Sequence, residues 1–408
     1  MLPEGWKTKQ LFDMALKISD GIHTTPKYSE KSSIYFVNGN NLKNGEIVLR
    51  ESTKYVDEND SVRHQKELGD RTLLMSINGT IGSLAYYKGE TIVLGKSACY
   101  INLKNTVDLD FIYYTLSDAR TQKFYTSEVT GTTIRNLSLK TIKATKILTP
   151  PLPEQKKIAQ ILSTWDQAIT ATERLLENSQ QRKKGLMQQL LTGRRRLPGF
   201  EGEWTKVQLK QIGSCIRGVT YKPSDICSQE NSETVRLLRS TNIQNWSIND
   251  KDLVIMPNKR VKAAQLLAPG DLAICMANGS KALVGKSAVF RGSKISYTAG
   301  SFCAIFRTHN DSDNRFSKIL FESSRYRQQI SVILAGSSIN NLKGSDVESM
   351  WFTAPTDPKE RSAIADRLSV ASVEINLLTG YLTSLKQEKK ALMQQLLTGK
   401  RRVQVEAA

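Results

Sequence analysis

Two short segments of the sequence end in Gly-Lys-Ser, a combination that phosphate-binding loops use to hold a nucleotide. They run from Gly89 to Ser97 and from Gly279 to Ser287. A phosphate loop needs four residues between its two glycines, so that its N–H groups converge on the phosphates, and each segment has five. The two segments also occupy non-equivalent places in an internal repeat, described below. We therefore interpret both as turns beside strands.

A second candidate for chemistry is the segment Thr149-Pro150-Pro151-Leu152, which slightly resembles the Asn-Pro-Pro-Tyr motif of adenine methyltransferases. That motif needs a polar side chain to hold the amino group and an aromatic ring to stack on a flipped base, and Thr149 and Leu152 supply neither well. No glycine-rich loop precedes it, and no H-E-x-x-H or G-x-S-x-G motif occurs in the sequence. We therefore expect a structural linker and no catalytic residues.

Metal-binding or disulfide chemistry is not predicted either. No two cysteines form a C-x-x-C pair, so we expect reduced thiols, buried inside the protein. The three histidines, His23, His64 and His309, are far apart in the sequence. The five cysteines are Cys99, Cys215, Cys227, Cys275 and Cys303.

The sequence begins without the apolar core of a signal peptide, and no stretch approaches the roughly 18 apolar residues of a membrane span. We therefore expect a cytoplasmic protein with no membrane partner. The formal net charge is +19 in 408 residues, which favours a polyanionic partner. Nucleic acid is the leading candidate, ahead of an anionic membrane surface or a charge that only aids solubility.

The chain repeats itself once. Residues 183–196 return as residues 389–402, an offset of 206 that holds over fourteen positions. Weaker matches extend upstream: Asn78-Gly79 matches Asn278-Gly279, and residues 131–137 match residues 336–342. A period of this length indicates duplicated domains and not a solenoid of short repeats.

Each half divides into a globular part and a long helix. Residues 1–150 and 200–355 are rich in Gly, Ser and Asn, with short β-type runs at 33–37 and 273–276 and helical patches at 110–121 and 315–334. This mixture predicts an α+β (mixed α/β) fold for both parts. Proline-rich junctions then lead into helices within residues 151–199 and 356–402, and residues 403–408 form a C-terminal tail.

Apolar or small residues recur in both helices in steps of four and three, which is typical of a coiled-coil seam. Lys183 and Lys389 interrupt both seams at the same place, and we expect Gly193 and Gly399 to stop the helices. We expect the helices to pack against each other, as an antiparallel or crossing pair, in preference to docking on their own domains. The seam residues are Ile158, Leu162, Trp165, Ile169, Thr172, Leu176, Ser179, Leu186 and Leu190, then Ile364, Leu368, Ala371, Ile375, Leu378, Leu382, Leu385, Leu392 and Leu396.

This arrangement, with Leu152-Pro153-Glu154-Gln155 before the first helix and Leu190-Leu191-Thr192-Gly193 at its end, resembles the specificity subunit of type I restriction-modification systems. The resemblance covers essentially the whole chain. One departure is visible: Glu360 keeps the acid of the first junction, but Arg361 replaces Gln155, so the second junction is expected to pack differently.

The resemblance implies two target-recognition domains that each read one half of a split, asymmetric DNA site. It implies that the paired helices, with a pseudo-twofold repeat, form an antiparallel coiled-coil spacer and dock two methyltransferase subunits. Those partners would bind S-adenosylmethionine and methylate adenine, and motor-nuclease subunits would use ATP. The chain itself would need no cofactor, no metal and no second copy of itself. The alternatives are a stand-alone DNA-binding or scaffolding protein, or a fused enzyme whose site the sequence does not reveal.

Base contacts need donors and acceptors on loops, and Arg favours guanine edges while Asn favours adenine edges. Asn78 precedes a glycine and is equally well explained as a turn former. Arg135 and Asn340 differ between otherwise matched loops, so they are the more informative pair. The candidate DNA contacts are Lys27, Tyr28, Asn78, Thr132, Thr133 and Arg135 in the first domain, and Tyr221, Lys222, Asn242, Asn245, Trp246, Lys281, Ser337 and Asn340 in the second.

A cluster of basic residues closes each helix, at 194–196 and at 400–402. Three roles are open for them. They could contact DNA phosphates, contact an acidic partner surface, or only complement the negative end of the helix dipole.

Overall fold

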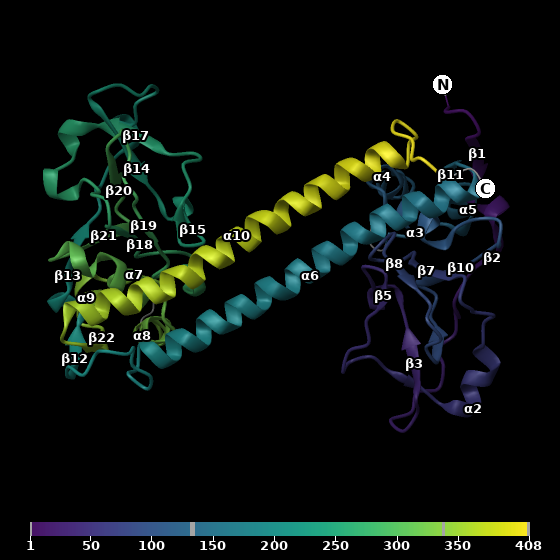
Figure 1. The fold of residues 1–408 in the computed structure, drawn as a ribbon, viewed down its shortest axis with the longest axis horizontal. Coiled ribbons are helices and arrows are strands. Elements are labelled where there is room, and N and C mark those ends of the chain that lie inside the picture. The colour runs from purple at the N-terminus through teal and green to yellow at the C-terminus, as the bar shows by residue number, and fades with distance from the viewer. Residues whose placement is uncertain (1, 131–134, 337–338, 406–408) are drawn as a thin grey trace. The chain divides into compact units, whose positions relative to one another are not determined.

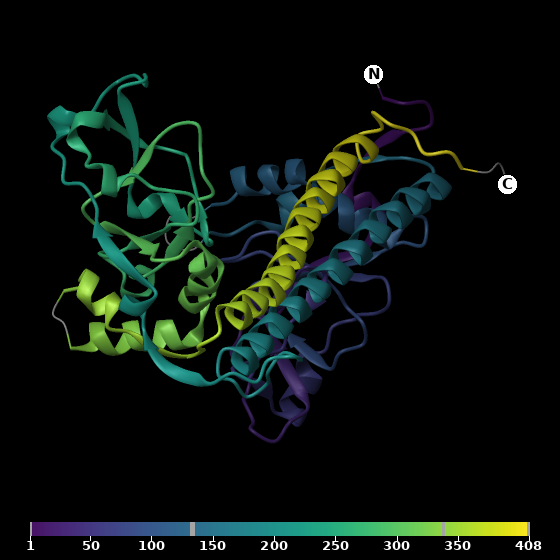
Figure 2. The same cartoon turned by 60° about the vertical axis from the view of Figure 1, so that its left-hand side comes forward.

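A computed structural model describes residues 2–130, 135–336 and 339–405. The chain divides into two compact units, and each unit is built from the start of one long helix and the end of the other. The first unit comprises residues 1–174 and 380–408, and the second comprises residues 175–379. Figures 1 and 2 show the globular part of each unit as a mixture of sheets and short helices beside the two long helices. The α+β fold predicted from the sequence is confirmed.

The first unit centres on a four-stranded antiparallel sheet with the strand order β2-β10-β7-β8. A smaller sheet, β6-β3-β9, pairs β3 with β9 in parallel, and β1 pairs with β11 where the domain meets the long helix. The strands of this unit are β1 Lys7–Gln10, β2 Ala15–Asp20, β3 Ile34–Val37, β4 Leu42–Lys43, β5 Glu46–Ile47, β6 Tyr55–Val56, β7 Thr72–Ser76, β8 Leu84–Tyr86, β9 Ile92–Leu94, β10 Ala98–Leu103 and β11 Lys146–Thr149.

The second unit repeats this plan. Its main sheet has the order β13-β21-β18-β19, its small sheet is β17-β14-β20 with β14 and β20 parallel, and β12 pairs with β22. The duplication inferred from the sequence is therefore a duplication of topology. The strands are β12 Trp204–Gln208, β13 Gly213–Arg217, β14 Thr234–Leu238, β15 Ile243–Gln244, β16 Ser247–Ile248, β17 Val254–Pro257, β18 Leu272–Cys275, β19 Ser287–Val289, β20 Tyr297–Ala299, β21 Cys303–Thr308 and β22 Trp351–Pro355.

The expected helical patch in each domain is two short helices and not one. Asp118 separates the pair in the first domain and Ser323 the pair in the second, and each side chain caps the following helix by accepting from a backbone N–H. The α-helices outside the long pair are α1 Leu11–Met14, α2 Glu58–Ser61, α3 Leu109–Ser117, α4 Ala119–Ser127, α5 Leu139–Lys143, α7 Asn314–Glu322, α8 Ser324–Ala335 and α9 Gly344–Glu348.

The long helices α6 (Leu152–Leu190) and α10 (Pro358–Leu396) have 39 residues each. In the first unit, Lys389 of α10 pairs with Asp166 of α6, and Lys386 pairs with Glu173 at 2.7 Å. In the second unit, Ser179 donates to Glu374 at 2.9 Å. Higher numbers on one helix meet lower numbers on the other, so the pairing within each unit is antiparallel, as expected.

The helix ends, however, also enter the domain cores. Ile158 and Leu162 share one hydrophobic core with Leu396 and the main sheet of the first unit, and Leu190 and Leu368 join the matching core of the second. The expectation that the helices pair in preference to docking on the domains is therefore wrong at their ends. The physical reason is that an apolar stripe at a helix end is wide enough to cover a partner helix and a sheet together.

Each long helix stops at a glycine in the left-handed conformation, Gly193 with φ +69° and Gly399 with φ +70°. A side chain there would also collide: a Cβ on Gly399 would lie 2.4 Å from Pro3 Cγ, and one on Gly193 would lie 3.3 Å from the Trp204 ring. The two stops predicted from the sequence are confirmed, and both let the N-terminal strand region of a domain approach the helix end.

Candidate nucleic-acid interface

Four loops of the first domain meet at one end of the main sheet. Gly79 N donates to the carbonyl of Arg135 at 3.2 Å, and Asn78 Nδ2 donates to the carbonyl of Lys96 at 3.5 Å. Thr80 Oγ1 donates to the carbonyl of Gly39 at 3.3 Å. We call residues 38–41, 77–82, 95–97 and 135–137 the first loop cluster. The structure thus brings the predicted residues Asn78 and Arg135 together.

The second domain builds the same arrangement. Asn278 N donates to the carbonyl of Asn340 at 3.3 Å, and Asn340 Nδ2 returns a bond to the carbonyl of Gly279 at 2.9 Å. Met276 N donates to the carbonyl of Phe302 at 2.8 Å. Residues 239–242, 277–283, 300–302 and 339–342 form the second loop cluster. Asn340 therefore lies beside the loop that carries Lys281, as the repeat predicts.

The clusters display different side chains in equivalent places. Gly95 is followed by Lys96 and Ser97 in the first cluster, whereas the matching Gly300 is followed by Ser301 and by Phe302, which is 68% exposed, in the second. Sequence reasoning missed Lys96 and Phe302, because only the strand pairing brings them beside the Asn-Gly turns. Lys96 belongs to a Gly-Lys-Ser segment whose last three residues, 95–97, lie between β9 and β10 without a following helix, so the interpretation as a turn beside strands is confirmed.

Four of the predicted DNA contacts are not observed as exposed loop residues, three because they are not described and one because it is buried. Thr132, Thr133 and Ser337 lie outside the described residues. Asn242 is 1% exposed, and its amide group donates to the carbonyls of Asn249 and Lys251 at 2.9 and 2.8 Å. Its side chain holds the loop from inside, as the buried Asn41 does in the first domain, so a base contact by Asn242 is not supported.

Four further candidates lie beside the small sheets. Tyr28 bridges to Val56 of β6, and Lys54 Nζ lies 4.3 Å from the Tyr28 ring. Lys27 N donates to Asp60 at 2.8 Å, which lowers the pKa of that carboxyl below its usual value. In the second domain Tyr221 packs against the hydrophobic cluster of the small sheet. The remaining candidate, Lys222, is exposed beside it.

Asn245 and Trp246 form the two-residue turn between β15 and β16, both with positive φ, at 48° and 62°. The matching turn of the first domain is Asn44-Gly45, with φ of 52° and 85°. Glycine adopts this conformation freely, but a tryptophan there is an outlier of the kind found at functional sites. Trp246 is 44% exposed.

A buried glutamate fastens the start of each long helix. Glu154 accepts from Arg402 at 2.7 and 2.9 Å and from Trp6 Nε1 at 3.1 Å. Glu360 accepts from Arg196 at 3.1 and 2.6 Å and from Trp204 Nε1 at 3.3 Å. We call these two sets the glutamate clamps. They give the last arginine of each basic cluster an internal partner, a role that the three sequence-based alternatives did not include.

The two junctions pack differently, as Arg361 predicted. Gln155 accepts from Asp108 N and donates to the carbonyl of Pro150, both at 2.9 Å, and the Asp108 carboxylate caps α3. In the second unit Asp313, at the matching position before α7, does not cap its helix and instead pairs with Arg361 at 3.1 Å. Burial raises the pKa of Asp313, and Arg361 partly offsets this.

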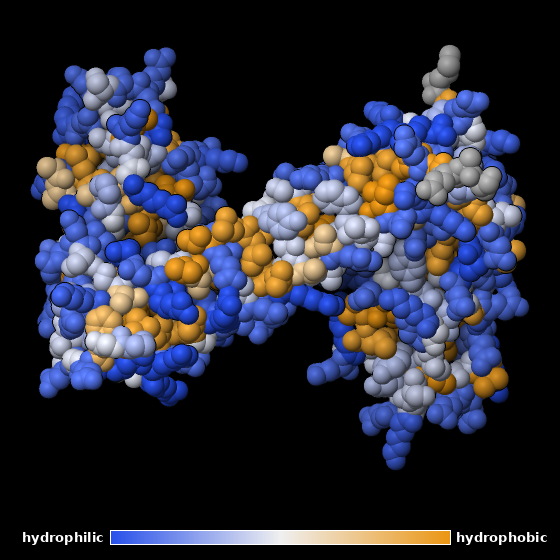
Figure 3. All heavy atoms as spheres, viewed as in Figure 1, coloured by the Kyte–Doolittle hydropathy of each residue, from blue (hydrophilic) through white to orange (hydrophobic). Residues whose placement is uncertain are grey.

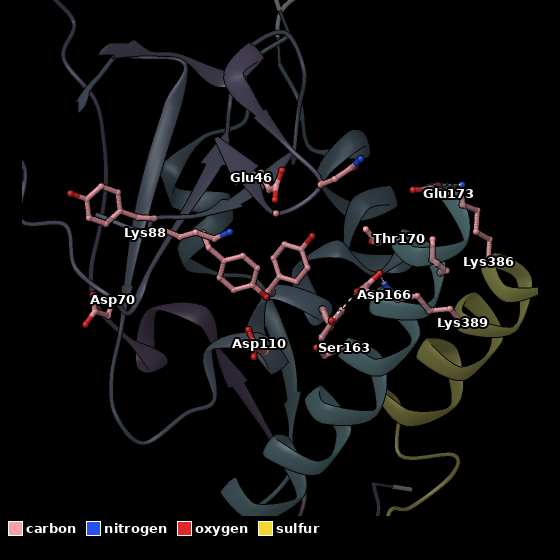
Figure 4. A pocket seen from close by; sticks show the side chains of 17 residues that line it. Glu46, Asp70, Lys88, Asp110, Ser163, Asp166, Thr170, Glu173, Lys386 and Lys389 are labelled. Atoms are coloured by element: carbon pink, nitrogen blue, oxygen red, sulfur yellow. Dashed lines mark hydrogen bonds and ion pairs between the residues drawn. The ribbon is translucent and has the colours of Figure 1, made fainter. Parts of the chain in front are cut away.

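A cleft of about 930 Å³ lies in the first unit between the turn at Asn44-Gly45, α3 and the two long helices. Figure 4 shows its acidic side chains with Lys386 and Lys389 of α10, and dashed lines join Lys389 to Asp166 and Lys386 to Glu173. Tyr86 and Tyr113 stack beside Asp110 with ring centres 4.7 Å apart. Burial, followed by the charge of Asp110, raises the pKa of Tyr86.

Neither metal ligation nor membrane insertion is suggested by the part of the chain that the structure describes. Residues 2–130, 135–336 and 339–405 hold no group of three His, Cys, Asp or Glu side chains placed to bind a metal ion. Within the same ranges, no helix combines the length and the apolar character needed to cross a membrane.

Comparison with known proteins identifies what the chain resembles. Residues 3–178 match the family described as "Type I restriction modification DNA specificity domain". The EcoKI specificity subunit of Escherichia coli (strain K12) is 31% identical over 197 residues, and the MjaVIII specificity subunit of Methanocaldococcus jannaschii is 27% identical over 332 residues. The chain is therefore similar to specificity subunits of type I restriction enzymes.

The extent of these matches differs. The EcoKI match covers 48% of this chain and 42% of that subunit, so the chain spans less than half the length of that relative. The MjaVIII match covers 78% of this chain and 76% of the relative. The solved specificity subunit from M. genitalium shares the fold, with a TM-score of 0.63 at 15% identity over 96% of both chains. This likeness in fold therefore extends over both domains and both long helices.

Proposed function

We propose that the chain recognises a two-part, asymmetric DNA sequence and directs partner subunits to it. The observation that carries the proposal is the pair of loop clusters, which have the same backbone framework and different exposed side chains. A repeated framework that displays Arg135 in one copy and Asn340 in the other suits two half-sites of different sequence, because these side chains favour different base edges. The net charge of +19 supports phosphate contacts around them.

The long helices are proposed as the spacer and as the docking surface for two methyltransferase subunits. On α10 in the second unit, Val370, Val373 and Leu377 are exposed and share one helix face. Figure 3 shows hydrophobic residues gathered along the exposed side of this helix. Exposed apolar stripes of this kind are typical of protein interfaces.

The remaining partners follow from the same proposal. Motor-nuclease subunits that use ATP would complete the endonuclease, S-adenosylmethionine would bind in the methyltransferase subunits, and this chain would contribute recognition without catalysis. We place the complex in the cytoplasm.

The test is to map methylated adenines in a host that carries the chain with its partner subunits, comparing wild type with Arg135→Asn and Asn340→Arg. We expect each variant to change the base preference in one half-site only, with a loss of about 10- to 100-fold for the original base, since a bidentate contact contributes about 1–3 kcal/mol. Lys7→Asn on β1, with the same charge change as Arg135→Asn, is the control. An unchanged motif in both variants, or methylation by the purified chain alone, would contradict the proposal.

A further inference from the structure

The second unit has a cleft in the place where the first unit has its acidic one. It encloses about 830 Å³ between the turn at Asn245-Trp246, the start of α8 and both long helices. We call this space the second cleft. Its floor is apolar and includes Met187, Leu191 and Phe352.

The charge of the second cleft is opposite to that of the first. Glu322 is its one carboxylate among the described lining residues. In the first cleft, acidic residues outnumber basic ones, with Glu46, Asp70, Asp110, Asp166 and Glu173 against three lysines. The cations of the second cleft are Lys183, Lys184, Arg291, Lys318, Arg325 and Arg327.

Internal partners occupy four of these six cations. Lys183 and Lys318 share Glu322, at 2.6 and 3.7 Å. Arg325 lies 3.8 Å from the Trp351 ring centre, and Arg327 donates to the backbone carbonyls of Ala282 and Val284. These four side chains therefore make contacts within the protein that stabilise the fold.

Lys184 and Arg291 remain. Both are exposed, and neither side chain has a hydrogen bond or ion pair within the described part of the chain. They stand on different elements, Lys184 on α6 and Arg291 two residues after β19. Their charge is available to a ligand that enters between them.

Trp246 supplies the third element. It extends an indole from a turn in which the first unit has Gly45, and it does so at a positive φ of 62°. Left-handed backbone costs a non-glycine residue about 1–2 kcal/mol. An exposed indole beside two unpaired cations and an apolar floor is the lining expected of a site that takes both charge and apolar surface.

We propose that the second cleft binds an acidic segment of a protein partner, in which carboxylates flank an aromatic or long aliphatic side chain. The carboxylates pair with Lys184 and Arg291, and the apolar side chain packs on Trp246 and the floor. A protein segment suits the site better than a nucleic-acid backbone, because the apolar side chains of the floor offer no hydrogen-bond donors to phosphate oxygens. The first unit lacks an equivalent site, because its cleft is lined mainly by carboxylates and has Gly45 in the place of Trp246. This proposal does not depend on the proposed DNA recognition, and the experiment below tests it separately.

The test uses the full chain and a fluorescein-labelled peptide of twelve residues, with aspartates and glutamates around a central phenylalanine. Binding is followed by fluorescence anisotropy. We expect Lys184→Glu/Arg291→Glu to weaken binding at least about tenfold. The matched control is Lys390→Glu/Lys88→Glu, the equivalent positions of the first unit, which should bind as wild type does. Trp246→Gly restores the glycine of the first unit and should weaken binding about threefold, as should a peptide with serine in place of phenylalanine.

Equal binding by wild type and the Lys184→Glu/Arg291→Glu variant would overturn the proposal, as would no binding by wild type at millimolar peptide. A single-stranded dT oligonucleotide is the second probe. If the oligonucleotide displaces the peptide and loses more affinity than the peptide does in the double variant, the cleft is a nucleic-acid site and the proposal is wrong. Far-ultraviolet circular dichroism melts confirm that each variant is folded.

Discussion

The two units are alike in their internal framework of sheets, loops and buried contacts, and they differ in their surface clefts. Both have the same sheet order, the same loop framework and the same glutamate clamp. They differ in the charge of the cleft, in the residue at the turn beside it, and in the junction where Gln155 is matched by Arg361. A buried polar contact must be satisfied in one specific way, whereas a surface cleft tolerates either sign of charge. After duplication the internal framework is therefore retained in both units, whereas the surface residues can differ.

The largest expected effect on stability comes from the glutamate clamps, which the two units share. Among the described side chains, Arg196→Ala leaves the fully buried Glu360 with Trp204 as its remaining donor, and we expect it to lower the free energy of unfolding by about 3–5 kcal/mol. Arg402→Ala should act in the same direction but less strongly, because Arg402 is 45% exposed and Arg196 29%. Urea unfolding followed by tryptophan fluorescence measures both. Arg195→Ala, at an exposed neighbour, should change the free energy of unfolding by less than about 0.5 kcal/mol. If Arg196→Ala were no worse than this control, the clamp would not stabilise the unit.

The turns at Gly45 and Trp246 give a smaller contrast. Gly45→Ala forces a side chain into left-handed backbone, with its Cβ 3.1 Å from Tyr113 Oη, so we expect a loss of about 1–2 kcal/mol in the free energy of unfolding. Trp246→Gly should leave the stability of the second unit unchanged or raise it. Thermal unfolding compares the two. Gly69→Ala is the control, because a Cβ there meets nothing within 4 Å. A larger loss from Trp246→Gly than from Gly45→Ala would show that the indole is a structural residue.

The junctions give the smallest effect, and it depends on pH. Burial raises the pKa of Asp313 above its ordinary value of 3.8, so the folded state binds this proton more tightly than the unfolded state does. The contribution of Asp313 to stability is therefore greatest at low pH and is lost as pH rises through the folded pKa. We expect the wild type to gain stability relative to Asp313→Asn as pH falls from 7 toward 4. Parallel urea titrations at several pH values measure the difference, and a constant difference would contradict the raised pKa.

Much of the framework could be predicted because its signals are local. The four-and-three spacing from Ile158 to Leu190 predicts a coiled-coil seam, and Gly193 predicts its end. The duplication predicts that Asn78 and Asn278 have equivalent surroundings. These patterns lie within a few turns of helix or within one loop, and so a single sequence contains them.

The rest depends on contacts between distant residues. Arg196 and Arg402 pair with glutamates 164 and 248 residues away, so the basic clusters could not be assigned from their own sequence. One available signal was the acid that both junctions keep, Glu154 and Glu360. Asn242 was misjudged because a polar residue in a loop looks the same whether its side chain points outward or holds the loop together. Matching it with Asn41 would have revealed the internal role.

The unequal composition of the units has a consequence for how the chain is made. The second unit is continuous, residues 175–379, but the first needs residues 380–408 to supply Leu396 to its core and Arg402 to its clamp. During synthesis from the N-terminus, the first domain therefore remains incomplete until residues 380–408 have emerged from the ribosome. The second unit can finish folding before the first, and until residues 380–408 emerge the Glu154 carboxylate has Trp6 but lacks Arg402, and the core of the first unit lacks Leu396.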